Sequence, residues 1–257
     1  MKRSFLAARP YVFGTISFAL LVGIWQFLVS DGIVRKFLIS SPHAVVVAMG
    51  HQAGNGELWR TLEPSGIEFA WALALSVAAG VVLGLVTGWW PRISLALGPL
   101  VWIGYSSPFI ALGPVFILTF GLGKDSVIAI AFLNAVFVIM INTERGVRNV
   151  DAKLVQAARS FGAHELEIFW KIVLPASLPL VMAGVRNAIG RVLAGVVLGE
   201  LFYGRGGVGY SLSYYQGIYR NDLMIGYILV IGLLGVILTQ LALVLERRLD
   251  SWRMEPS

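Results

Sequence analysis

The sequence contains no cysteine and few charged residues. Without cysteine, disulfide bridges and thiolate chemistry are excluded. Charged residues make up 13% of the 257 residues, which is about half the share found in soluble domains. The three histidines, His43, His51 and His164, are far apart along the chain, and their spacing predicts no metal site. This composition excludes an ordinary soluble domain.

Apolar residues are abundant instead. They make up 57% of the chain, and the mean hydropathy is +0.78. About 20 apolar residues in a helix cross the roughly 30 Å hydrocarbon core of a bilayer, and a helix satisfies its own backbone polar groups there. The long, continuous apolar runs therefore predict an all-α membrane protein. Its six transmembrane helices are expected over residues 12–30, 66–89, 93–120, 126–141, 178–201 and 223–245.

The basic residues are distributed unevenly between the predicted loops. The formal net charge of +6 could suggest a nucleic-acid partner, but basic residues of membrane proteins concentrate in cytoplasmic loops. With the N-terminus inside, twelve of the 20 Lys and Arg residues lie on the inner side and six on the outer side, while Arg186 and Arg191 lie within the fifth span. This bias predicts a multi-pass protein of the cell's inner or plasma membrane, with cytoplasmic N- and C-termini and no nucleic-acid partner.

Three glycines, Gly80, Gly84 and Gly88, repeat every four residues in the second predicted span. That spacing places them on one helix face, and small residues let two helices approach closely in lipid. We expect this face to pack tightly against another span.

Several polar residues inside the predicted spans are candidates for a translocation path. Prolines interrupt the third span, and irregular backbone at membrane depth is tolerated where it lines a wet cavity. Four of these candidates are the central proline, Pro108, and the three residues before it, Tyr105, Ser106 and Ser107. The other three are Asn134, Arg191 and Glu200.

Each of these candidates also has a structural explanation. The third span could be a kinked packing helix, and Arg191 could pair with a neighbouring helix or with a second copy of the chain. Arg191 and Glu200 are nine residues apart, about 180° around a helix, so they cannot pair with each other. If Arg191 instead faced a path, it would give that path a positive potential suited to an anion.

A mixed, charged segment, residues 151–175, interrupts the apolar sequence between the fourth and fifth spans. Asp151 is a good N-cap for a short helix, and Gly162 stands where that helix would end in a left-handed turn. A second short helix would follow, before Pro175 and Pro179 bracket the start of the next apolar run. We therefore predict two short helices joined by a sharp glycine turn on the cytoplasmic side.

This segment resembles the EAA loop of ABC importer permeases, which reads Glu-Ala-Ala, three residues, Gly, nine residues and Ile-x-Leu-Pro. The corresponding residues here are Gln156, Ala157, Ala158, Gly162, Ile172, Leu174 and Pro175. Gln156 departs from the usual Glu, which removes a charge and keeps the hydrogen-bonding reach. The resemblance implies that these residues couple the chain to a separate ATPase. The alternative is an amphipathic hairpin that merely connects two spans.

Other segments resemble the nitrate, taurine and alkanesulfonate branch of these permeases, over residues 37–245. They are FLISSP at 37–42, SPFIALGPVFIL at 107–118, FGLGKDS at 120–126, NT at 142–143, GVRNVD at 146–151 and EL at 200–201. The resemblance implies a type-1 ABC importer permease bundle of six transmembrane helices with cytoplasmic coupling helices. It also implies two copies per transporter as a homodimer, two cytoplasmic ABC ATPase subunits that bind Mg-ATP, and an extracytoplasmic substrate-binding protein.

The predicted organisation has four parts. Residues 1–36 form an N-terminal segment and the first helix, and residues 37–63 an extracytoplasmic connection. Residues 64–246 form the transmembrane core that contains the coupling loop, and residues 247–257 a cytoplasmic tail.

The expected function is that of a permease subunit of an ATP-driven importer. It would move a small, anionic solute, similar to nitrate, a sulfonate or taurine, delivered by a binding protein. The chain has no Walker motif, so we expect no enzyme activity and no cofactor of its own. The alternative is an ATP-independent channel or an integral membrane enzyme, and co-purification with an ATPase would separate these possibilities. Oxyanions, sulfonates and aromatic or pyrimidine-like compounds all remain candidate substrates.

Overall fold

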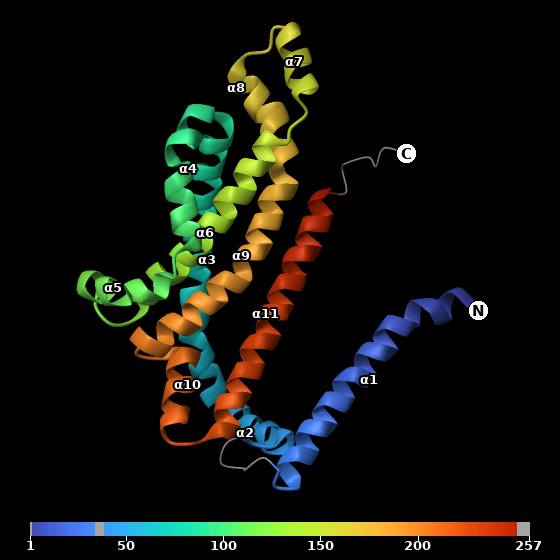
Figure 1. Cartoon of the computed structure of the whole chain (residues 1–257), viewed down its shortest axis with the longest axis vertical. Helices are drawn as coiled ribbons and strands as arrows, with labels where there is room; N and C mark the ends of the chain where they lie inside the picture. Colours follow the sequence, from blue (N-terminus) through green and yellow to red (C-terminus); the bar gives the residue numbers. More distant parts are fainter. Residues whose placement is uncertain (1, 34–38, 251–257) are drawn as a thin grey trace. The chain divides into compact units, whose positions relative to one another are not determined.

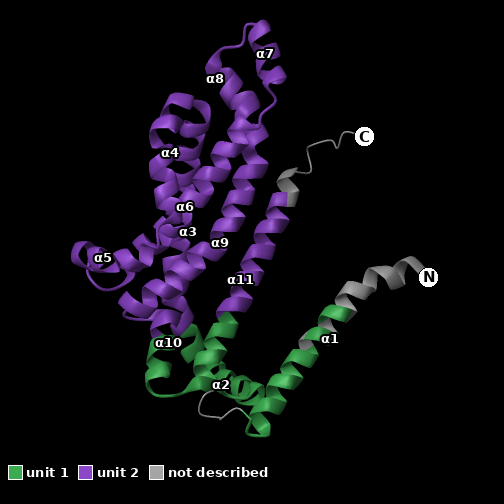
Figure 2. Ribbon diagram, viewed as in Figure 1, with its two compact units in different colours: residues 1–60, 211–230 green, residues 61–210, 231–257 purple. Residues whose placement is uncertain are grey.

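The computed structural model describes residues 2–33 and 39–250, and these residues contain helices and short connections but no β-strand. The chain divides into two compact units (Figure 2). Unit 1 comprises residues 1–60 and 211–230, and unit 2 comprises residues 61–210 and 231–257. The predicted connection 37–63 and the predicted tail 247–257 lie partly outside the described residues, as does the beginning of the FLISSP segment.

The helices are labelled in Figure 1. In chain order they are α1 (Lys2–Ser30), α2 (Pro42–Gly54), α3 (Glu57–Trp89), α4 (Pro91–Ser106), the 3₁₀ helix η1 (Phe109–Leu112), α5 (Gly113–Phe120), α6 (Lys124–Arg148), α7 (Ala152–Ser160), α8 (Glu165–Ile168), the π-helix η2 (Phe169–Val173), α9 (Leu174–Tyr203), α10 (Gly207–Gly217) and α11 (Asn221–Asp250).

Four helical segments of the described chain are long and apolar enough to cross a membrane. They are Glu57–Trp89, Lys124–Arg148, Glu165–Tyr203 and Asn221–Glu246. A fifth span results if Pro91–Ser106 and Phe109–Phe120, which are bent by 89°, count as one, and α1 contains a shorter apolar stretch, Ala19–Ser30. The prediction of an all-helical membrane protein is confirmed.

Two helices extend beyond the predicted spans. The polar connection was expected to run to residue 63, but α3 begins at Glu57, where the Asn55 side-chain oxygen accepts from the Glu57 N–H at 3.1 Å. The fourth span was expected to end at residue 141, but α6 continues to Arg148. An ion pair between Glu144 and Arg148, one turn apart and 3.0 Å long, supports this last part of the helix.

Only one of the three prolines of the third span breaks the helix. Pro99 lies inside α4, and Pro114 lies in the first turn of α5, where its missing N–H costs nothing. Pro108 forces the preceding Ser107 into an extended conformation with ψ 133°, so α4 ends there. The chain then turns sharply into η1 and α5 (Figure 1).

The first half of the 151–175 segment forms as predicted. The Asp151 carboxylate accepts from the Lys153 N–H at 2.8 Å and caps α7, and Gly162 adopts φ +81° after the helix ends. The second half differs, because α8 continues through η2 into α9 and Pro175 makes no break. A proline ring clashes with the carbonyl four residues earlier, and the wider π-turn just before Pro175 moves that carbonyl away.

Unit 2 has its core where α3, α6 and α9 meet. The cluster consists mostly of small or β-branched side chains: Ala72, Val127, Ala131, Ala135, Ile139, Ala188, Val192 and Val196. Gly80, Gly84 and Gly88 lie against Ile139, Thr143 and Val147 of α6, one glycine per turn. The lack of side chains on this face of α3 is what brings the α3 and α6 backbones together.

Replacing Gly84 by alanine tests this close approach. A Cβ at Gly84 would lie 2.5 Å from Thr143 Cβ and 2.6 Å from the Met140 carbonyl oxygen, so the helices would have to separate. We expect the free energy of unfolding in detergent to fall by roughly 1–3 kcal/mol, as in other overpacked cores. Gly66→Ala, on the same helix, is the matched control because a Cβ there meets nothing within 4 Å. An equal loss in both variants would contradict the packing account.

Candidate functional site

Three helices of unit 2 each contribute one face to a cavity of about 410 Å³, which we call the arginine pocket. From α4 come Trp102 and Tyr105, three residues apart, and from α9 come Asn187 and Arg191, four apart. The α6 face supplies the other lining residues, Val138, Ile141, Asn142 and Arg145. The helical repeat places each set on one face of its helix, and the packing of the three helices brings these faces together.

The arginine pocket carries positive charge. Among the described residues that line it, two are arginines and none is Asp or Glu. The nearby Glu144 is paired with Arg148 at 3.0 Å, and Glu246 with Arg186 at 2.9 Å, so these carboxylates are engaged elsewhere. An uncompensated pair of guanidinium groups in a half-buried cavity attracts an anion.

The aromatic side chains hold the arginine pocket in shape. The Arg191 guanidinium carbon lies 4.6 Å from the centre of the Tyr105 ring, a cation–π contact between α9 and α4. Trp102 and Tyr105 meet edge to face, with ring centres 5.8 Å apart. The Asn142 amide donates to the Val138 carbonyl at 2.8 Å, which fixes the orientation of that side chain.

The structure brings together two of the seven predicted path residues, Tyr105 and Arg191. Ser106, Ser107 and Pro108 lie at the α4 break and do not line the pocket, and neither do Asn134 and Glu200. Sequence reasoning missed Trp102, Asn142 and Arg145. The signal was their helical spacing, since Trp102 precedes Tyr105 by three residues and Arg145 follows Asn142 by three.

The 151–175 segment leaves an apolar surface uncovered. Leu154 of α7 and Phe161 just after it are exposed, Phe161 to 92%, while Ala158 packs against a cluster around Val147, Ile168 and Val173. Gln156, Ala157 and Gly162 are also exposed, whereas Ile172, Leu174 and Pro175 are half-buried where η2 joins α9. Arg159 donates to both carboxylate oxygens of Glu165, at 2.8 and 3.2 Å, and so joins α7 to α8.

A second cavity of about 620 Å³ lies beside this hairpin. Its lining is mostly aromatic: Trp89, Trp90, Arg159, Glu165, Leu166, Phe169 and Trp170. Tryptophan is enriched where a protein crosses the boundary between hydrocarbon and water. The aromatic lining is therefore typical of a hairpin base that lies at a membrane surface.

Comparison with known proteins agrees with this architecture. The family described as "Binding-protein-dependent transport system inner membrane component" matches residues 76–251. The chain belongs to this family. The chain is similar to two relatives named as putative aliphatic sulfonates transport permease proteins SsuC. The protein of Bacillus subtilis is 31% identical over 91% of this chain and 85% of the relative. The protein of Escherichia coli is 32% identical over 90% of this chain and 88% of the relative. A chain of the inward-facing MetNI methionine ABC transporter shares the fold, with a TM-score of 0.61 and 20% identity over 74% of this chain and 93% of that one.

The family match confirms a binding-protein-dependent permease, and its relatives named for sulfonate transport belong to the branch of ABC importer permeases that the sequence resembles. The protein is an inner-membrane transport component for a small solute, and it is not an enzyme. An ATP-independent channel or a membrane enzyme is not favoured.

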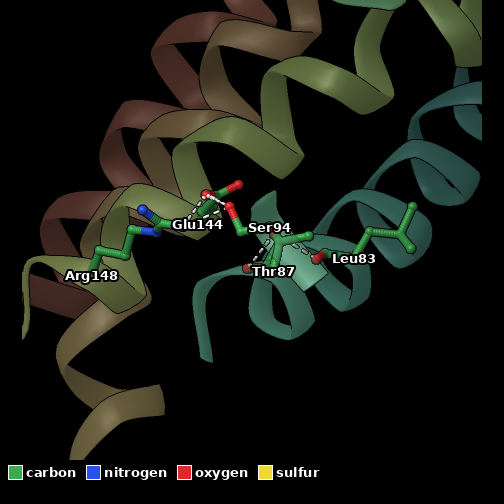
Figure 3. Close-up of polar contacts among 6 residues, drawn as sticks. Leu83, Thr87, Ser94, Glu144 and Arg148 are labelled. Atoms are coloured by element: carbon green, nitrogen blue, oxygen red, sulfur yellow. Dashed lines mark hydrogen bonds and ion pairs between the residues drawn. The ribbon is translucent and has the colours of Figure 1, made fainter. Parts of the chain in front are cut away.

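A polar network connects α4 to the end of α6 in this permease (Figure 3). The Ser94 hydroxyl donates to Glu144 at 2.8 Å and accepts from Arg148 at 2.6 Å, and the Glu144–Arg148 ion pair completes the triangle. The hydroxyl of Thr87, near the end of α3, donates to the Leu83 carbonyl of the same helix at 2.9 Å. The network joins the first turn of α4 to the end of α6, just before the 151–175 hairpin begins.

Glu200, near the C-terminal end of α9, is buried in the permease and is 1% exposed. One carboxylate oxygen accepts from the Ser65 hydroxyl at 2.5 Å and the other from the Gly209 N–H at 2.6 Å, while Ser65 itself accepts from the Val208 N–H at 2.9 Å. A carboxylate is favourable beside the free N–H groups at a helix start. Glu200 therefore anchors the beginning of α10 to α3 and α9, and it is a structural residue in this conformation.

The variant Glu200→Gln tests this anchor. Glutamine has one acceptor oxygen, so its NH₂ group would face the Ser65 or Gly209 donor. We expect a loss of roughly 1–3 kcal/mol in the free energy of unfolding and faster tryptic cleavage after the exposed Arg205. Glu63→Gln, an exposed site on α3 with the same charge change, is the control. The anchor is refuted if cleavage after Arg205 and stability are the same in both variants.

Proposed function

We propose that this permease is the membrane subunit of an ATP-driven importer of a small anion. The single observation that carries the anion assignment is the arginine pocket, in which Arg145 and Arg191 lie together and no acidic residue of the described chain lines the wall. The sulfonate groups named for two relatives are anions of the kind that such a pair of guanidinium groups binds.

Six spans cross the membrane in this proposal: α1, α3, the bent pair α4 and α5, α6, α9 and α11. Both termini are cytoplasmic, which places the 151–175 hairpin in the cytoplasm and follows the excess of basic residues on that side. The transmembrane core is 64–246, after the N-terminal segment 1–36 and the extracytoplasmic connection 37–63, and the tail 247–257 is cytoplasmic.

The 151–175 hairpin is the coupling element. Its exposed Leu154 and Phe161 form an apolar surface suited to the groove of a partner protein, and the EAA-like residues flank it. They are Gln156, Ala157, Ala158, Gly162, Ile172, Leu174 and Pro175. The partners are two cytoplasmic ABC ATPase subunits that hold Mg-ATP, an extracytoplasmic binding protein that delivers the solute, and a second copy of this chain in the membrane lipid.

Alternating access follows from this arrangement. ATP binding moves the ATPase subunits, the hairpin moves with them, and α9 carries that motion to the wall of the arginine pocket. The pocket then opens to one side of the membrane at a time, with Tyr105 and Arg191 at its centre. Ser106, Ser107 and Pro108 form the bend beside the path, and Asn134 lies on the neighbouring α6.

Substitution of Gly162 tests the coupling role. A Cβ there meets nothing within 4 Å, so the cost of a side chain comes only from the positive φ of +81°. A β-branched residue in this conformation costs about 1–2 kcal/mol, or about 5–30-fold in the population of the docked hairpin. We expect Gly162→Val to insert normally and to lower ATP-driven sulfonate uptake in proteoliposomes by that factor. Gly162→Asn, which tolerates the left-handed turn, should retain uptake, and equal uptake by both variants would count against the assignment.

Charge-neutral substitution tests the anion path. We expect Arg191→Gln and Arg145→Gln to lower sulfonate uptake about tenfold or more, the value of a lost hydrogen bond to a charged group. Arg92→Gln is the control, because Arg92 is exposed at the start of α4 and does not line the pocket. Unchanged uptake by the Arg191 variant, with normal assembly, would show that Arg191 is structural and would end the anion proposal.

A further inference from the structure

The arginine pocket has an aromatic side as well as a charged side, and this second feature concerns which anions it accepts. We propose that the pocket selects organic anions that carry a flat, ring-shaped body, with the ring on Trp102 and the anionic group between Arg145 and Arg191. This inference rests on the proposed function, since it names the class of solute for the same site.

Trp102 is the aromatic surface available to a ligand. Tyr105 already has the Arg191 guanidinium at 4.6 Å from its ring centre and the edge-to-face contact with Trp102. The Trp102 side chain lies on the pocket wall and is 54% exposed. An aromatic ring gains from offset or edge-to-face contact with an indole beyond the area that it buries, whereas a short alkyl chain gains only from the area.

The size of the cavity favours a body larger than a simple oxyanion. The pocket encloses about 410 Å³, within the range of about 300–1,000 Å³ that is typical of sites for organic ligands of moderate size. A small inorganic anion would leave most of this space to water, and water weakens the attraction between the anion and the two guanidinium groups. A ring beside Trp102, Val138 and Ile141 would displace that water.

The charged side complements such a ligand. Arg145 and Arg191 present planar guanidinium groups that can each bind two oxygens of a sulfonate or carboxylate. Asn187, one turn before Arg191 on α9, adds a carboxamide to the same wall. The charged wall comes from α6 and α9, and the aromatic wall comes from α4. A ligand therefore needs both an anionic group and a ring to contact all three helices.

The test measures ligand binding to the permease assembled with its ATPase subunits in nanodiscs. The binding protein is left out, because its own selectivity would mask that of the pocket. The probes are benzenesulfonate and ethanesulfonate, which share the anionic group and differ in the ring, and binding is followed by equilibrium dialysis. We expect benzenesulfonate to bind about 3–10-fold more tightly than ethanesulfonate, the value of one aromatic contact. In Trp102→Leu this ratio should fall about 3–10-fold, because the leucine, Val138 and Ile141 still bury the ring but supply no aromatic contact, with ethanesulfonate affinity unchanged.

Three further variants complete the design. Trp102→Phe keeps a ring and should keep the preference. If Trp102→Leu does not fold, the ratio of the two affinities in the wild-type protein remains the test. Trp71→Leu removes an exposed tryptophan of α3 outside the pocket and should change nothing. Arg191→Gln should weaken both probes equally.

The results separate the two proposals. If the wild-type protein binds both sulfonates equally, or if Trp102→Leu keeps the preference, the ring inference is overturned while the anion path stands. If Arg191→Gln binds both probes as well as the wild type does, or if neither probe binds the wild type, the anion path fails and the ring inference fails with it.

Discussion

The close contact of α6 with α3 and α9 is the constraint on which the rest of unit 2 depends. Glycines face bulkier residues across this contact, as Gly84 faces Thr143 and Gly195 faces Ala131. In lipid no hydrophobic force drives two helices together, so van der Waals contact between close backbones has to stabilise the bundle. Because α6 and α9 both approach closely, Arg145 and Arg191 come to line one cavity. The same packing holds Glu144 within reach of Ser94.

Two kinds of arginine lie in or beside the spans, and their surroundings decide their roles. Arg148 and Arg186 have carboxylate partners, Glu144 and Glu246, and those pairs are structural. Arg145 and Arg191 line a cavity that contains no carboxylate of the described chain, and Arg191 contacts an aromatic face instead. A charge in a span is costly unless it meets protein, water or a ligand. That difference is the physical reason for assigning the solute to the second pair.

Local signals in the sequence predicted local structure well. Asp151 caps α7 and Gly162 takes a left-handed turn, because each depends on a few neighbouring residues. Contacts between distant segments could not be predicted in this way. Nothing in the sequence around Ser65 indicates that its hydroxyl meets Glu200, and the pairing of Trp102 with the α6 and α9 residues depends on three helices packing together. Two of the eight residues that line the pocket were therefore predicted, and the hairpin was predicted in its first half, the capped α7 and its glycine turn.

The π-turn at Phe169–Val173 joins α8 to α9 without interruption, so Glu165–Tyr203 is one continuous helical segment of 39 residues. At about 1.5 Å per residue it is roughly 58 Å long. The hairpin is attached at one end, Arg191 lies along its length, and Glu200 holds α10 near the other. A displacement at the hairpin end of a continuous helix is passed along its backbone. In the proposed orientation, one movement of the hairpin would therefore reach both the arginine pocket and the start of α10.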